Sequence, residues 1–129
     1  MKGFFGNIEE LTKENENFRK VLYTAQGMQL VLMSLKPGEE IGGETHDIDQ
    51  FIRIERGEGV VIMGEDQRSI ENEFAVIIPR GMFHNVINKG DTAMKLYSIY
   101  ATPEHKDGTI HATKADAEVE EHFDGKTTE

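Results

Sequence analysis

The sequence predicts an all-β fold, a sandwich or barrel of short antiparallel strands. Runs rich in Val, Ile, Leu, Phe and Tyr recur along the chain, and clusters of Gly, Pro, Asp and Asn separate them. No amphipathic segment of helical length lies between these runs, which disfavours a parallel βαβ sheet. We expect strands at residues 18–24, 28–35, 51–56, 59–63, 75–78, 84–88 and 94–101.

Short helical segments are expected at both ends of this β core. Residues 7–19 are polar and tolerate a helix, and Asn7 is a candidate N-cap before Ile8. Residues 112–129 are charged and contain helix formers without a continuous apolar stripe. A length of 129 residues fits one domain. We therefore expect a single domain over residues 1–129, with a β core at about 18–102 and a C-terminal strap and acidic tail at about 103–129.

The composition of the chain limits the classes of molecule that it is expected to bind. The formal net charge is −10, which disfavours nucleic acid and anionic membranes as binding partners. The absence of Cys excludes disulfides and thiolate metal sites. The N-terminal sequence does not resemble a signal peptide, and no run approaches the length of a membrane span. We expect a cytoplasmic protein whose partner is a small-molecule substrate or ligand.

One polar cluster predicts a metal site. Glu44 and His46 are two residues apart, so in extended backbone their side chains project to the same side. Gln50 can join them across a turn, and His84 can complete the set from a distant strand. Such a set of nitrogen and oxygen donors without sulfur suits Mn, Fe(II), Ni, Co or Zn.

The spacing around these residues resembles the cupin superfamily. Gly38, Glu44, His46, Gln50 and Gly57 are spaced like its first motif, which is Gly, five residues, His-x-His, three or four residues, Glu, six residues, Gly. The second motif is matched by Pro79-x-Gly81-x-x-His84-x-x-x-Asn88, but Glu73 replaces its opening Gly. The resemblance implies a cupin double-stranded β-helix, a jelly-roll barrel of the RmlC-like type.

The metal ligands implied by the resemblance depart from the usual three His and one Glu. Here Glu44 replaces the first His and Gln50 replaces the Glu. The two changes offset in charge, since one carboxylate and three neutral ligands remain, and this favours a retained metal site. The predicted metal ligands are Glu44, His46, Gln50 and His84.

The C-terminal strap adds a closer resemblance to small cupins labelled mannose-6-phosphate-isomerase-like. Its residues 102–117 contain His105 and His111, whose role stays open between a lid over the barrel mouth and a structural strap.

Two functions remain open from the sequence. One is a metal-dependent enzyme acting on a small polar substrate, either a sugar isomerase or a dioxygenase or decarboxylase. The other is a non-catalytic module that binds a metal or small ligand. Strands that are apolar on both faces, such as 51–54 and 94–100, also lead us to expect a homodimer.

Overall fold

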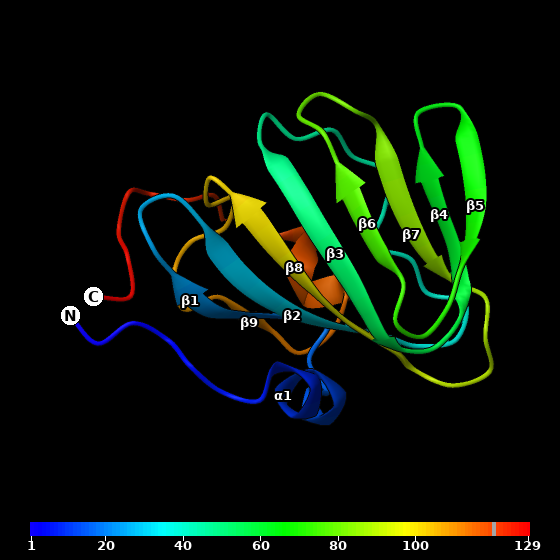
Figure 1. The fold of residues 1–129 in the computed structure, drawn as a ribbon, viewed down its shortest axis with the longest axis horizontal. Helices are drawn as coiled ribbons and strands as arrows, with labels where there is room; N and C mark the ends of the chain where they lie inside the picture. The colour runs from blue at the N-terminus through cyan, green and yellow to red at the C-terminus, as the bar shows by residue number, and fades with distance from the viewer. Residues whose placement is uncertain (120) are drawn as a thin grey trace.

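The computed structural model describes residues 1–119 and 121–129, and it is built mainly of antiparallel strands (Figure 1). A helix, α1 (Ile8–Glu14), precedes the strands, and a single 3-10 turn at Ala115–Glu118 follows them. The strands are β1 (Arg19–Thr24), β2 (Gln29–Leu35), β3 (Asp49–Arg56), β4 (Gly59–Met63), β5 (Asp66–Ile70), β6 (Ala75–Ile78), β7 (His84–Asn88), β8 (Met94–Ala101) and β9 (Ile110–His111).

The strands form two sheets that enclose one core. The larger sheet has the order β6-β3-β8-β2-β1-β9, and the smaller has the order β5-β4-β7. Figure 1 shows the smaller sheet at one end of the molecule, next to β6, and the β1 and β9 edge at the other. Apolar side chains from both sheets pack together in the space between them, among them Met33, Ile52, Val61, Val86 and Leu96.

The predicted all-β fold is confirmed, and each of the seven expected strands is present with its ends within two residues. Two strands were not predicted. In β5 four of five side chains are exposed, so this edge strand lacks the apolar alternation that marks a half-buried strand. Strand β9 has only two residues and is defined by its pairing with Arg19 and Lys20 of β1.

The helical expectations are confirmed at one end only. Asn7 caps α1, and its side chain accepts a hydrogen bond from the Glu10 amide at 3.0 Å. At the C-terminus the helix formers make no more than the 3-10 turn in the described residues. A charged segment without an apolar stripe gains little from packing, which usually supplies most of a helix's stability. No helix in the described part of the chain is long and apolar enough to cross a membrane.

Glu73 occupies a backbone position that suits glycine. Its φ is +72°, and it is the one non-glycine residue with positive φ in the ranges 1–119 and 121–129. The turn is held by hydrogen bonds from the Glu73 amide to the Ile54 carbonyl at 2.7 Å and from the Phe74 amide to the Glu71 carbonyl at 3.1 Å. The sequence motif has Gly at this place, so the departure carries a backbone cost here.

We predict that Glu73→Gly stabilises the protein by about 1 kcal/mol. Relief of the left-handed conformation is worth roughly 1–2 kcal/mol, and the added freedom of Gly in the unfolded chain removes part of this gain. Urea unfolding followed by circular dichroism measures the difference. Glu71→Gly, at an exposed neighbour whose φ is not positive, is the control and should lower stability. A loss of stability in Glu73→Gly would contradict the strain argument.

Candidate metal centre

Backbone pairing brings two distant predicted ligands together. Glu44 and His84 form an isolated antiparallel bridge, in which the Glu44 amide donates to the His84 carbonyl at 3.0 Å and the reverse bond is 2.9 Å. The turn before β7 also holds His46, because the Gly81 amide donates to the His46 carbonyl at 2.9 Å. Gly81 has a φ of +82°, so this turn uses the conformational freedom of glycine.

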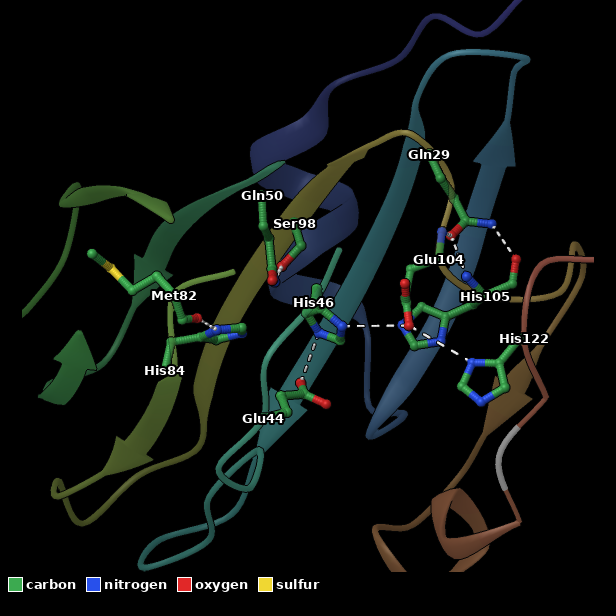
Figure 2. Close-up of polar contacts among 10 residues, drawn as sticks. All are labelled: Gln29, Glu44, His46, Gln50, Met82, His84, Ser98, Glu104, His105 and His122. Atoms are coloured by element: carbon green, nitrogen blue, oxygen red, sulfur yellow. Dashed lines mark hydrogen bonds and ion pairs between the residues drawn. The ribbon is translucent and has the colours of Figure 1, made fainter. Parts of the chain in front are cut away.

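The side chains of Glu44, His46 and His84 converge on one point. One ligand atom from each of the three lies within 4.8 Å of the others, an arrangement that can hold a metal ion. The two imidazole rings are 5.2 Å apart between centroids. Figure 2 shows the three side chains close together, with Gln50 and Ser98 drawn above them.

His84 is held in a tautomer that suits a metal ligand. Its Nδ1 atom lies 3.0 Å from the carbonyl oxygen of Met82. A carbonyl only accepts hydrogen bonds, so Nδ1 carries the proton and, in the neutral ring, Nε2 has a free lone pair. The side chain is buried, with 2% of its surface exposed, so water does not satisfy that lone pair freely.

Two buried atoms at this place lack a polar partner, His84 Nε2 and Gln50 Oε1, and the buried His46 Nε2 has only the Glu44 carboxylate at 3.2 Å. Buried polar atoms are normally paired, and leaving one unpaired costs about 1–3 kcal/mol. All three are atom types that coordinate divalent transition metals. The residues present therefore fit a metal ion.

Gln50 faces the barrel interior as expected. It is 3% exposed, and its Nε2 donates to Ser98 Oγ at 3.2 Å, which leaves the amide oxygen as the free atom. The next inward positions on β3, Ile52 and Ile54, are fully buried. Whether Gln50 binds a metal directly stays a prediction. Asn88 ends the strand that begins with His84, and its side-chain amide donates to the carbonyls of Leu35 and Thr92.

Two carboxylates flank His46 and set its charge. Its Nε2 lies 3.2 Å from Glu44 Oε1, and its Nδ1 lies 3.4 Å from Glu104 Oε1. Burial opposes the positive charge, but contacts with Glu104 and Glu44 outweigh it and raise the pKa of His46 to about 9. Burial likewise opposes ionisation of Glu44, but the His46 imidazole keeps the pKa of that carboxyl below its usual value. Without a metal the pair is therefore an imidazolium beside a carboxylate.

A cavity of about 190 Å³ adjoins Glu44 and His46. Its remaining lining comes mostly from the C-terminal strap, which places His105 and His111 inside the cavity wall. Figure 2 shows Glu104 between His46 and His122. The full lining is Arg19, Glu44, Thr45, His46, Glu104, His105, His111, Glu121 and His122.

Gln29 holds the strap in this position. This side chain is fully buried, its Oε1 accepts from the amides of Glu104 and His105, and its Nε2 donates to the His105 carbonyl at 2.8 Å. Sequence reasoning missed Gln29 and Glu104, and it found no basic residue for the pocket. The structure shows such a basic residue, because Arg19 lines the cavity. The alternation of β1, which buries Arg19 and Val21 and leaves Lys20 half-buried between them, was the available signal.

Known proteins are similar to this chain in sequence and in fold. Residues 31–100 match the family model of the cupin domain, Cupin_2. The chain belongs to the cupin family. The matched range contains all four predicted ligands of this cupin, but neither Arg19 nor the strap. The mannose-6-phosphate-isomerase-like subtype stays a prediction.

Two uncharacterised proteins are similar in sequence. YrkC of Bacillus subtilis is 50% identical over 123 residues, which is 90% of this chain and 66% of YrkC. Protein L612 of Acanthamoeba polyphaga mimivirus is 42% identical over 109 residues, which is 81% of this chain and 68% of L612. The cupin thus spans about two thirds of the length of the curated relatives it matches.

Solved structures support the same fold. BH2720 of Bacillus halodurans is 46% identical with a TM-score of 0.89, and the match covers 91% of this chain and 94% of that one. MJ0764 of Methanocaldococcus jannaschii, an RmlC-like cupin with a double-stranded β-helix fold, is 13% identical with a TM-score of 0.64, covering 70% and 84%. The double-stranded β-helix expected from the sequence motifs is confirmed.

We predict that the His46 imidazole of the metal-free protein titrates at about pH 9. This folded-state pKa lies above the unfolded value of 6.5, so the ion pairs of His46 stabilise the fold fully below pH 6.5 and lose that effect as the pH rises through about 9. NMR titration of the histidine ring protons measures the pKa. Glu104→Gln should lower it, and an unchanged midpoint in that variant would contradict the assigned cause.

Proposed function

We propose that this cupin is a metal-dependent enzyme that acts on a small polar molecule in the cavity beside Glu44 and His46. A divalent transition metal, Mn, Fe(II), Ni, Co or Zn, would be held by Glu44, His46 and His84, with Gln50 as a fourth ligand. The observation that carries the proposal is the pair of buried donor atoms without partners, His84 Nε2 and Gln50 Oε1, beside the Glu44–His46 pair. Unpaired polar atoms are costly inside an apolar barrel, and a bound ion would satisfy them.

The chain's own groups prepare this site for an ion. The Met82 carbonyl orients the His84 ring through its Nδ1, and the Glu104 carboxylate contacts Nδ1 of His46. Hydrogen bonds of this kind to the outer nitrogen of a ligating imidazole fix its tautomer and raise its basicity. Glu44 supplies the one carboxylate of the set. A bound ion would act as a Lewis acid toward oxygen atoms of the substrate.

The cavity determines what reaches the ion. Its opening beside Glu44 and His46 leaves room for a molecule of a few non-hydrogen atoms, and its walls are polar and charged. Isomerisation of a sugar and dioxygenation or decarboxylation of a small acid are the reaction classes that such a site supports. The Tyr100 ring packs edge-on against His46 and His105, two residues that line the cavity.

The alternative is a binding module without turnover. Glu44 and Glu104, the carboxylates nearest His46, are both engaged with that imidazole, so neither is free to move a proton to or from a bound molecule. This observation favours a module that binds a metal or small ligand without catalysing a reaction.

Metal analysis tests the proposal first. Protein purified without added metal should contain, or accept on dialysis, one divalent ion per chain by inductively coupled plasma mass spectrometry. Oxygen uptake and sugar-phosphate isomerisation are then followed with each metal. A metal-holding protein that turns over no tested substrate supports the binding module, and a protein that cannot be loaded overturns both readings.

Substitution of the ligands separates their contributions. We predict that His46→Ala and His84→Ala each abolish metal binding, because each removes one of only two imidazoles. Gln50→Ala should weaken binding, and Gln50→Glu should strengthen it by adding a second carboxylate. Isothermal titration with Zn²⁺ measures the affinities. Asn88→Ala is the control on the same strand, and unchanged affinity in Gln50→Ala would remove Gln50 from the ligand set.

A further inference from the structure

Arg19 is a buried cation that forms no ion pair with any carboxylate in residues 1–119 and 121–129. Only 8% of its surface is exposed, and its Nε atom has no hydrogen-bond partner. Its Nη1 lies 3.3 Å from Nδ1 of His111, and within the described residues no carboxylate forms an ion pair with the guanidinium. Burial and the Arg19 charge lower the pKa of His111, so that imidazole is neutral and does not balance the charge. A buried charge left unpaired is costly, and proteins normally provide it with a counter-ion.

The guanidinium enters the barrel rather than lying on its surface. Arg19 and Val21 are both buried on β1, and Val21 belongs to the hydrophobic core. Across the sheet Arg19 pairs with Met33 of β2, which is fully buried, and with His111 of β9. The side chain therefore points inward, and it lines the cavity together with Glu44 and His46.

Charges around the cavity leave Arg19 available for an anion. The carboxylates of Glu44 and Glu104 are engaged elsewhere, because both contact the His46 imidazole. Glu121 also lines the cavity, but its carboxylate is half-exposed and lies 3.9 Å from Lys106. Among the lining residues that the structure describes, Arg19 is a cation with no carboxylate in ion-pair contact.

We propose that Arg19 anchors a small carboxylate in this cavity, so that the ligand of the protein is a small organic acid. The position of the subsite beside the metal rests on the function proposed above, whereas the anchoring by Arg19 does not need the metal. The planar fork of a guanidinium matches a carboxylate in a bidentate pair. A cavity of about 190 Å³ suits a molecule of few non-hydrogen atoms.

Charge favours a carboxylate over a phosphate. One guanidinium matches a single negative charge, whereas a phosphate monoester carries up to two at neutral pH. Glu44 and Glu104 lie in the same cavity wall and would repel the second charge. His105 does not supply a further cation, because burial and then Arg19 hold its pKa well below the usual range.

Binding of glycolate to the metal-free protein tests the anchor independently of the metal. Isothermal titration should show binding of glycolate but not of its neutral amide, glycolamide. Arg19→Gln should weaken glycolate binding by about tenfold or more, because a hydrogen-bonded charge is lost. Arg19→Lys, which keeps the charge without the fork, should fall between the two. Lys20→Gln, at the neighbouring position that is not directed into the cavity, is the matched control and should bind as the wild type does.

A second measurement uses the unmodified chain, in case a variant fails to fold. In ¹⁵N-labelled wild-type protein the Arg19 Nε–H resonance should shift on addition of glycolate and stay in place with glycolamide. A purely structural role would appear as lower stability of Arg19→Gln with unchanged glycolate binding, and would overturn the proposal. Tighter binding of inorganic phosphate than of glycolate would overturn the assignment to a carboxylate. Failure to load a metal would leave the glycolate result intact and count against the proposed function alone.

Discussion

Everything at the site depends on polar atoms kept unpaired inside an apolar barrel. Nε2 of His84 and the amide oxygen of Gln50 have no hydrogen-bond partner, and His46 Nε2 meets only the Glu44 carboxylate. Ile52 and Ile54, on the strand that carries Gln50, belong to the hydrophobic core. Leaving these polar side-chain atoms unpaired costs free energy, and backbone hydrogen bonds of the residues that carry them hold the atoms in place. The bridge between Glu44 and His84 fixes one side, and the bond from Gly81 to His46 fixes the other. The fold thus orders the donors before any ion arrives.

The outer half of the cavity is held by a different set of contacts. Gln29 binds the backbone of Glu104 and His105, and β9 joins the strap to the edge of the large sheet through β1. Glu104 then contacts His46, so the strap influences the protonation of a predicted ligand. The strap thus contacts the predicted metal site through the Glu104 carboxylate.

The sequence was informative where chemistry and spacing coincide. Glu44, His46 and His84 could be placed together because motif spacing and strand alternation agree, and the same alternation placed Gln50 inside. It was less informative where distant segments meet. Arg19, Gln29 and Glu104 occupy unremarkable positions in sequence, and only the pairing of β1 with β2 and β9 brings them to the cavity. Short polar strands such as β5 were missed because pairing, and not apolar periodicity, defines them.

Departures from the family pattern differ in physical kind. Glu44 and Gln50 exchange donor types while keeping a single carboxylate, so the charge of the site is conserved. Glu73 replaces a glycine at a φ of +72° and offers no such compensation in the turn that it forms. The first departure changes the chemistry of the site, and the second affects only the stability of the fold.

The division between residues 31–100 and the flanking segments separates two kinds of evolutionary freedom. All predicted ion-holding groups lie inside the family-matched range, whereas the cavity's arginine and most of its histidines lie outside it. Changes in the strap or in β1 can therefore alter the cavity wall without replacing any of the predicted ligands. A barrel built in this way can acquire new ligands by exchanging its outer segments, while the residues predicted to hold the ion stay in place.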